Sequence, residues 1–305
     1  MRNFTFKGLF LAAMFMVLGS LAIQAADNDG LITKQITVKL DKAGTLPDKI
    51  GSTKKKQITN LKIIGEINGT DWCFIREMAG CDYNCEKTGG KLSMLDLSDA
   101  KIVKGGLPYI KYMGGVYTSN DKLGYAAFSG CSDLTSLVIP SSVTSIGRSA
   151  FSGCSSLTSL TIPSSVTMIG WSAFEGCSGL TSLTIPSSVT SIGNYAFEGC
   201  SGLTSIYVYP EKTPKLGTDI FSGCDAKKCK VYVPTGTYDD YWLSEFGYFE
   251  NIEEFDATDI DNVTTASDAK EVSRYSVNGQ RLSAPAKGLN IVKYSDGSVK
   301  KVVVL

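Results

Sequence analysis

The residues that could carry chemistry in this chain of 305 residues are limited by one absence, because the sequence contains no histidine. Without histidine there are no Ser-His-Asp triads, no Cys-His pairs and no histidine metal ligands. Ser52 and Lys55 fit a Ser-x-x-Lys spacing, but so short a pattern often arises by chance. No glycine-rich phosphate loop precedes a helix, and no zinc-type cysteine cluster has its partner pair. The sequence therefore predicts a protein that is not an enzyme and has no catalytic residue, cofactor or metal site.

The nine cysteines fall into two groups with different expected roles. Five of them recur at intervals of 23 or 24 residues, each directly after a glycine: Cys131, Cys154, Cys177, Cys200 and Cys224. Equivalent side chains of stacked coils point the same way, which suits a disulfide poorly, so we expect a ladder of buried thiols. The odd total leaves at least one thiol free. Disulfide pairing is left open for Cys73, Cys81, Cys85, Cys224 and Cys229.

The same interval governs a longer pattern, which identifies the elements that must position any site. Between Gly124 and Pro234 the chain repeats a 23-residue unit typified by IPSSVTSIGRSAFSGCSSLTSLT. A phenylalanine marks each unit, at Phe128, Phe151, Phe174, Phe197 and, after 24 residues, Phe221. A fixed period of this length predicts a solenoid, in which each unit forms one coil stacked on the next.

Each coil has two stretches whose apolar residues are expected to face inward. The first follows the L-x-x-L-x-I pattern of a leucine-rich repeat strand up to Ile162, and Pro163 ends it. The second runs over residues 166–169, and Phe174 then makes the largest contribution to the core. One coil alone orders too many residues for the apolar surface it buries. The coils must therefore stack, and the two ends of the stack must be capped.

The remaining segments predict an export signal, two caps, a linker and a small terminal module. Arg2 and Lys7 precede an apolar run over residues 8–23, and Ala25 and Ala26 follow, which is typical of a secretory signal peptide. No later stretch is apolar enough to cross a bilayer. The predicted segments are a signal peptide (1–25), an N-terminal cap with degenerate repeats (26–123), the array (124–234), a C-terminal capping helix (235–256), a linker (257–270) and a small β module (271–305).

Local patterns give expectations within these segments. Before the array we expect a helix from Asp71 to Met78 with Thr70 as its N-cap. The other expectations for the caps are degenerate strands at 61–64 and 92–97, a solvated turn at 54–56, an inserted loop at 103–122 and an amphipathic helix at 238–246.

The C-terminal part carries two further signals. Asn278-Gly279 and Asp296-Gly297 are dipeptides that favour tight hairpin turns, and they predict paired strands in the terminal module. Asp256, Asp259 and Asp261 could hold a calcium ion, but their spacing matches no known loop. We favour a solvated linker there.

The unit of Ile-Pro, Val-x-x-Ile-Gly, Ala-Phe, Gly-Cys and Leu-x-x-Leu resembles the BspA-like leucine-rich repeat family of bacterial surface proteins. The resemblance covers 124–234 and implies a curved, right-handed solenoid of the α/β repeat type with a parallel sheet on one face and a cap at each end. Members are associated with adhesion to host proteins or other cells, and they carry no catalytic residues to transfer. The terminal module is similar to short sorting tails of exported proteins, although Asn290 replaces a tyrosine that is frequent in them.

Departures from the repeat consensus indicate where the surface is individual. A tryptophan, a tyrosine and an arginine fall close together at one corner of the coils and have the composition of a binding hot spot. Neutral variation at turns is the alternative. The candidate ridge residues are Arg148, Trp171, Asn194, Tyr195, Glu175 and Glu198. On the sheet face, a flat hydroxyl array that could accept glycans or polar protein segments is formed by Ser159, Thr161, Ser182 and Thr184.

Composition narrows the partners. The 30 lysines and arginines balance 30 aspartates and glutamates, which argues against nucleic acid because phosphate recognition needs a basic surface. We therefore predict a secreted or cell-surface protein for adhesion or protein–protein recognition, with an extracellular host or bacterial protein as its partner. The alternative is a carbohydrate-binding accessory protein of a glycan-utilisation system. The ligand, the mode of surface attachment and the oligomeric state are left open.

Overall fold

The computed structural model describes residues 30–112 and 114–256 and four terminal strands within 271–304. The chain forms two compact units, Met1–Phe255 and Asp256–Leu305, which we describe separately. Four predictions lie outside the described residues: the signal peptide (1–25), the linker (257–270) with Asp259 and Asp261, and the two turn dipeptides Asn278-Gly279 and Asp296-Gly297.

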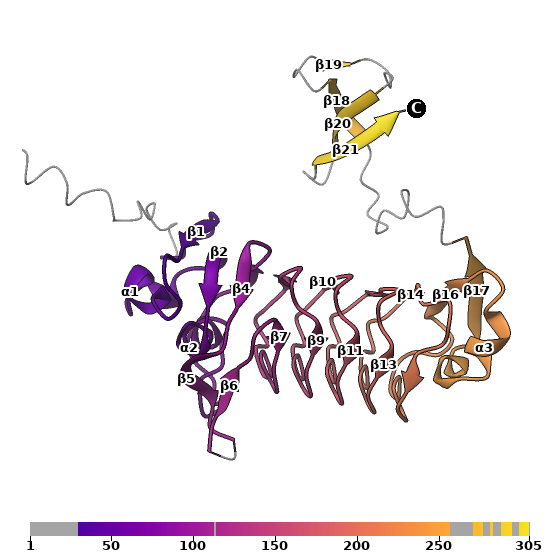
Figure 1. The fold of residues 1–305 in the computed structure, drawn as a ribbon, viewed down its shortest axis with the longest axis horizontal. Coiled ribbons are helices and arrows are strands. Elements are labelled where there is room, and N and C mark those ends of the chain that lie inside the picture. Colours follow the sequence, from indigo (N-terminus) through magenta and orange to yellow (C-terminus); the bar gives the residue numbers. More distant parts are fainter. Residues whose placement is uncertain are drawn as a thin grey trace, which may run out of the picture. The chain divides into compact units, whose positions relative to one another are not determined.

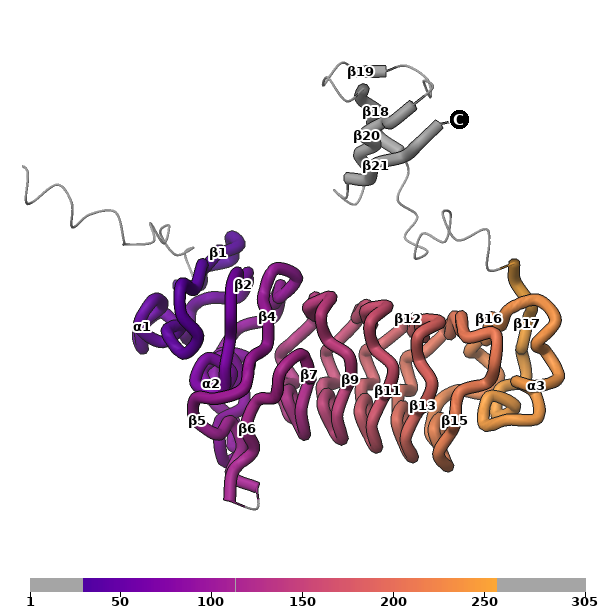
Figure 2. The backbone as a smooth tube through the Cα atoms, in the orientation of Figure 1, coloured from indigo at the N-terminus to yellow at the C-terminus, as the bar shows by residue number. Residues whose placement is uncertain are grey.

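The first unit is a stack of coils in which each coil supplies one strand to each of two sides (Figure 1). On one side the strands are β8 (Ser136–Val138), β10 (Ser159–Thr161), β12 (Ser182–Ile185), β14 (Ser205–Val208) and β16 (Lys230–Pro234). On the other they are β7 (Lys122–Leu123), β9 (Ser145–Ile146), β11 (Met168–Ile169), β13 (Ser191–Ile192) and β15 (Lys215–Leu216). Neighbouring strands are parallel, and most pairs join residues 23 apart, such as Leu160 with Leu137. The solenoid predicted from the period is confirmed, and Figure 2 shows its successive turns side by side.

The longer strands do not form one continuous parallel sheet. The N-terminal sheet has the order β1-β2-β3-β8-β10, with β4 also paired to β2, and the C-terminal sheet has the order β12-β14-β16-β17. No strand pairing joins β10 to β12, whereas the shorter strands β7 to β15 form an unbroken five-stranded sheet. The predicted single sheet on one face is therefore two sheets that follow one another along the stack.

A column of phenylalanines forms the centre of the core. The five rings of Phe128, Phe151, Phe174, Phe197 and Phe221 are at most 1% exposed. Consecutive ring centroids are 5.6, 5.0, 5.2 and 5.7 Å apart, with interplanar angles of 10° or less. This spacing is close to the separation of about 4.8 Å between paired strands, so hydrogen bonding and ring stacking demand the same coil separation.

Cap residues close both ends of this column. Trp72 packs on Phe128 with centroids 5.1 Å apart, and its Nε1 donates to the carbonyl of Ala127 at 2.9 Å. At the other end Phe246 and Phe249 lie 5.1 and 5.0 Å from Phe221. The two predicted caps are therefore present, and each covers the last ring with aromatic side chains.

The N-terminal cap contains the helix that supplies Trp72. Helix α2 (Gly69–Met78) has Asn68 as its N-cap, so the prediction of Thr70 was wrong. Asn68 accepts from the amide of Thr70 at 3.0 Å, while Asp71 accepts from the amide of Asn68 at 3.0 Å. The other elements of this cap are β1 (Ile36–Lys39), α1 (Leu46–Ile50), η1 (Lys54–Lys56), β2 (Asn60–Ile67), β3 (Met94–Asp96) and β4 (Ala100–Ile102).

Two predicted irregular segments are ordered by contacts with α2. The predicted loop at 103–122 contains a hairpin of β5 (Gly105–Ile110) and β6 (Val116–Thr118), because Tyr109 and Ile110 are buried. The predicted turn at 54–56 is the 3-10 helix η1, and Lys55 forms an ion pair with Glu77 of α2. Both segments are anchored by partners that are distant in sequence.

The C-terminal cap differs from the predicted single helix at 238–246. It consists of α3 (Tyr238–Trp242), η2 (Glu245–Tyr248) and β17 (Asn251–Phe255). Ser244 is extended and its hydroxyl accepts from the amide of Phe246, which starts a new turn and separates the two helices. In the second unit β18 (Glu271–Ser276), β19 (Arg281–Leu282), β20 (Gly288–Tyr294) and β21 (Val299–Val304) form an antiparallel sheet in the order β19-β18-β20-β21.

The repeated cysteines form the buried ladder that the sequence predicts. Each thiol donates to the carbonyl of the phenylalanine in the preceding coil, for example Cys177 to Phe151 at 3.2 Å. The same bond recurs from Cys154, Cys200 and Cys224. All nine cysteines are free thiols in this structure, so none of the possible disulfides is formed.

Truncation of one ring should test how far the column holds the array together. We expect Phe174→Ala to lower the free energy of unfolding by about 3–5 kcal/mol, because it removes a buried ring stacked on both sides. Urea unfolding measures the change. Met168→Ala in the same coil is the matched control, since Met168 is 46% exposed. A loss below about 1 kcal/mol for Phe174→Ala would contradict the central role of the column.

The thiol ladder should make stability depend on alkaline pH. Burial raises the pKa of the Cys177 thiol from 9.0 to about 12. The unfolded chain therefore releases this proton at lower pH than the folded chain, and the stabilisation present below about pH 8.5 is lost as pH rises toward 12. Urea unfolding at a series of pH values should show a steeper decline for the native sequence than for Cys177→Ala. Equal slopes would count against this assignment.

Candidate functional site

The candidate ridge stands on a corner whose backbone geometry repeats in every coil. At this corner the chain enters the left-handed region, with φ of 55° at Ser149, 50° at Ser172 and 57° at Tyr195. The amide of each of these residues donates to a carbonyl in the next coil, as from Ser149 to Trp171 at 2.8 Å. Coil-to-coil hydrogen bonds at the corner therefore hold equivalent side chains in one column.

Glycines before the corner allow the coils to approach this closely. A Cβ added to Gly170 would lie 2.6 Å from the carbonyl carbon of Gly147, which is shorter than any real contact of this kind. Gly193 has the same relation to Gly170, at 2.7 Å. These glycines remove side-chain bulk beneath the corner, so the residues that follow them project outward as a tight column.

Three of the predicted ridge residues contact one another. The guanidinium carbon of Arg148 lies 4.7 Å from the centre of the Trp171 ring, a cation–π geometry. The ring of Tyr195 lies 6.1 Å from Trp171 at an angle of 36°. Trp171 remains 45% exposed. We refer to Arg148, Trp171 and Tyr195 as the corner ridge.

The other predicted ridge residues have different surroundings. The side-chain oxygen of Asn194 accepts from the amide of Thr218 at 3.3 Å, so this residue braces the next coil. Glu175 and Glu198 belong to a second corner, where their carbonyls accept from the amides of Gly153 and Gly176. Their side chains are partly exposed and form no ion pair with any described residue.

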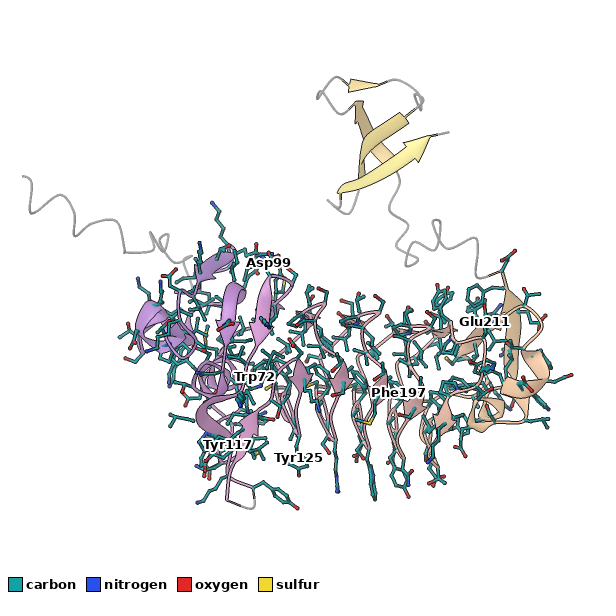
Figure 3. The ribbon with its side chains drawn as sticks, in the orientation of Figure 1. Trp72, Asp99, Tyr117, Tyr125, Phe197 and Glu211 are labelled. Atoms are coloured by element: carbon teal, nitrogen blue, oxygen red, sulfur yellow. The ribbon has the colours of Figure 1, made fainter. Side chains whose placement is uncertain are left out.

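A pocket of about 480 Å³ adjoins the N-terminal end of the same column of corners. Tyr125, which precedes Arg148 by one repeat, stacks on Tyr112 of the β5–β6 hairpin with centroids 5.1 Å apart. Figure 3 shows Tyr125 at the edge of the stack and Phe197 within the coils. We call this space the cap pocket; its wall includes Tyr83, Cys85, Lys111, Tyr112, Tyr125 and Ser149.

The predicted hydroxyl residues lie on the longer strands, away from the corner ridge. Ser159 and Thr161 of β10 are exposed, whereas Ser182 and Thr184 of β12 are partly buried. The hydroxyl of Ser205 donates to that of Ser182 at 3.1 Å. In the row that contains Thr184, the next strands carry Tyr207 and Tyr232. The hydroxyl array and the corner ridge are therefore two separate surfaces.

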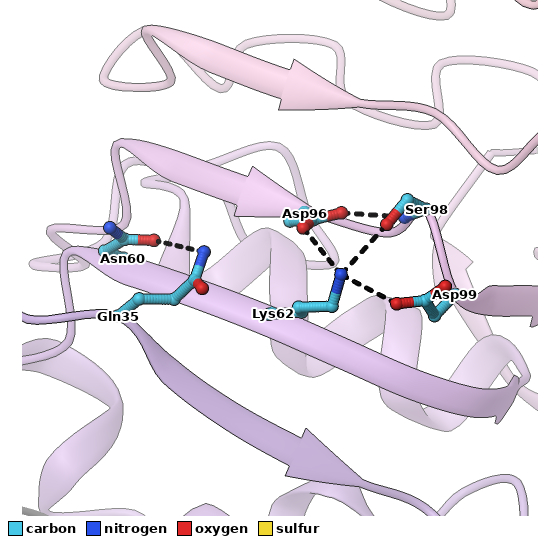
Figure 4. Close-up of polar contacts among 6 residues, drawn as sticks. All are labelled: Gln35, Asn60, Lys62, Asp96, Ser98 and Asp99. Atoms are coloured by element: carbon cyan, nitrogen blue, oxygen red, sulfur yellow. Dashed lines mark hydrogen bonds and ion pairs between the residues drawn. The ribbon is translucent and has the colours of Figure 1, made fainter. Parts of the chain in front are cut away.

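The charges on the sheet face are paired near its ends. Lys62 of β2 contacts carboxylate oxygens of Asp96 at 2.9 Å and Asp99 at 2.7 Å (Figure 4). Hydrogen bonds to Asp99 and Asp96 raise the pKa of Lys62 and keep it cationic. Lys230 and Glu253 form a similar pair at 2.8 Å. The central strands thus present hydroxyl groups without net charge.

Two aromatic pairs were missed by the sequence analysis. Tyr207 and Tyr232 stack on the sheet face with centroids 4.7 Å apart and planes 10° apart. Tyr125 stands one repeat before Arg148, so extending the corner column by one unit would have identified it. Its partner Tyr112 carries no such signal, because the hairpin that holds it lies outside the repeat.

Among the described residues, no helix has both the length and the apolar character needed to cross a membrane. Residues 121–244 match the model of a BspA type leucine rich repeat region, in six copies. No curated protein matches the chain.

Solved structures that resemble this chain are all distant. A leucine-rich repeat protein from Bacteroides ovatus ATCC 8483 is 22% identical, with a TM-score of 0.39 over 75% of this chain and 44% of the other. A leucine rich cell surface protein from Faecalibacterium prausnitzii A2-165 is 20% identical, with a TM-score of 0.32 over 70% and 55%. A leucine rich repeat protein of T. pallidum is 16% identical, with a TM-score of 0.33 over 66% and 89%. The chain spans less than half of the length of the Bacteroides protein.

The corner ridge should contribute little to stability, which a single substitution can test. We expect Trp171→Ala to lower the free energy of unfolding by less than about 1 kcal/mol, because the ring is largely at the surface. The buried Leu180→Ala in the next coil is the comparison and should cost about 2–5 kcal/mol. Equal losses in urea unfolding would show that Trp171 is a structural residue.

Proposed function

We propose that this chain, in which residues 121–244 form a BspA-type leucine-rich repeat region, is a binding protein that recognises another protein through its corner ridge. Solenoids expose extended surfaces and have one main core, so their sites are formed by columns of side chains. The corner ridge joins Trp, Tyr and Arg, the residue types most enriched in binding hot spots. The contact of Arg148 with the exposed Trp171 is the observation that carries the proposal.

The conformation of Tyr195 supports a role beyond folding. Its φ of 57° places a bulky side chain in the left-handed region, which costs an ordinary residue about 1–2 kcal/mol. Asparagine or glycine would adopt this conformation more readily. A large aromatic residue retained at such a corner, beside an exposed tryptophan, fits selection for a surface contact.

The partner is a protein outside the cell, from a host or from another bacterium. This part of the proposal rests on the signal peptide predicted at 1–25 and on the resemblance of the repeats to surface proteins. The protein would be secreted or held at the cell surface, and it would act in adhesion. A function in binding, with no catalytic step, agrees with the lack of histidine.

Binding measurements with the folded variants would test the corner ridge. Against a panel of purified extracellular matrix proteins and bacterial surface proteins, we expect Trp171→Ala with Tyr195→Ala to weaken the best interaction by about 10-fold or more. Biolayer interferometry would give the dissociation constants.

The control is Thr161→Ala with Thr184→Ala on the sheet face, which should leave the affinity unchanged. A partner that binds the ridge double variant as tightly as the native chain would remove the corner ridge as the site. Loss of binding in the sheet-face variant alone would move the site to the hydroxyl array.

A glycan is the second candidate ligand, and the stacked Tyr207 and Tyr232 favour it. Aromatic rings beside hydroxyl groups provide the mixed apolar and polar contacts that small-molecule sites use. This surface would serve a carbohydrate-binding accessory protein of a glycan-utilisation system. The same two double variants tested on a glycan array separate the candidates, because only the sheet-face variant would lose glycan binding.

A further inference from the structure

Two cysteines meet in the turn that follows α2, next to the cap pocket. The sulfur atoms of Cys81 and Cys85 contact one nitrogen atom, Nη2 of Arg76, at 3.2 and 3.9 Å. The turn is closed by a hydrogen bond from the amide of Cys85 to the carbonyl of Asp82 at 3.1 Å. The two thiols are therefore neighbours within a single short turn.

The two thiols differ sharply in access to solvent. Cys85 is exposed and contributes to the wall of the cap pocket, whereas Cys81 is only 2% exposed. Burial raises the pKa of the Cys81 thiol, and the charge of Arg76 opposes that rise. One thiol can meet a reactant from solution, and the other can be reached only through its neighbour.

Arg76 is unusual because its charge is buried without an acidic partner. Its side chain is fully buried, and no described aspartate or glutamate forms an ion pair with it. Its Nη1 donates to the carbonyls of Ala126 and Ala127, and its Nε has no hydrogen-bond partner among the described residues. A guanidinium in this state favours negative charge on a sulfur atom beside it.

We propose that Cys81 and Cys85 are a redox-active pair that closes to a disulfide by exchange with a disulfide-bearing oxidant. The Cys85 thiolate attacks one sulfur of the oxidant, which breaks the oxidant's S–S bond and releases one thiolate. Cys81 then loses its proton to solvent and attacks Cys85 Sγ, which breaks the mixed disulfide and releases the second thiolate. The two cysteines lose two protons and two electrons, and the oxidant is reduced to two thiols.

Closure would act on the wall of the cap pocket. The turn that carries Cys85 also carries Tyr83 and Asn84, which line the same pocket. Cys85 adopts a left-handed conformation with φ of 64°, so the turn is already held in an uncommon geometry. A covalent link to the buried Cys81 would restrict this wall, while the remote thiol ladder would stay reduced.

Oxidised glutathione is the probe for this exchange in the full chain. After incubation, alkylation and proteolysis under non-reducing conditions, we expect mass spectrometry to find a peptide with a Cys81–Cys85 disulfide and no alkylation at either residue. Reduction should restore both alkylation sites. A glutathione that stays on Cys85, an unmodified Cys85, or a disulfide to Cys73 would each overturn the proposal.

Single variants separate the roles of the two thiols. Cys81→Ser should accumulate a stable glutathione adduct at Cys85, because the second step is lost. Cys85→Ser should leave Cys81 unmodified in the folded protein, because solvent does not reach it. The matched control Cys73→Ser, which changes another cysteine of α2, should form the disulfide as the native chain does. Equal adduct formation on Cys81 and Cys85 would contradict the assigned order of attack.

Discussion

The separation between neighbouring coils is the constraint on which the rest of the structure depends. Parallel strand pairing fixes it near 4.8 Å, and the phenylalanine rings, stacked 5.0 to 5.7 Å apart, accept the same value. The thiol ladder adds a hydrogen bond from each coil to the carbonyl of the preceding phenylalanine. Because ring, thiol and strand require the same repeat, a change of core volume in one coil is transmitted to its neighbours. The caps then need only to cover the first and last rings.

The same constraint shapes the surface. A glycine before each corner lets two backbones touch, and the left-handed residue after it directs an amide to the next coil. Side chains at the corner are therefore placed by the backbone and are free to vary in type. This explains how arginine, tryptophan and tyrosine can be brought together on a surface without using any core residue. Specificity in such a fold changes by substitution at fixed positions.

The junction between the N-terminal cap and the first coil is chemically different from the array. There the period ends, and side chains with no counterpart elsewhere meet: Arg76 with two thiols, and Tyr112 with Tyr125. The cap pocket lies at this junction. A repeat offers the same environment many times, whereas a boundary offers a unique one. Reactive groups and enclosed volume accordingly occur where the regular stacking stops.

The sequence by itself determined the solenoid, the identity of its core columns and the need for two caps, because this information is local and recurs every 23 residues. It also located the corner ridge, since equivalent positions of a repeat must lie together. Only the tertiary structure decided which of Asn68 and Thr70 caps α2, and it did so through Asp71, whose second carboxylate oxygen also accepts from the amide of Leu46. The β5–β6 hairpin and the pairing of Cys81 with Cys85 around Arg76 likewise depend on contacts between segments that occur once. Such contacts have no period, so their partners become known only when the chain is folded.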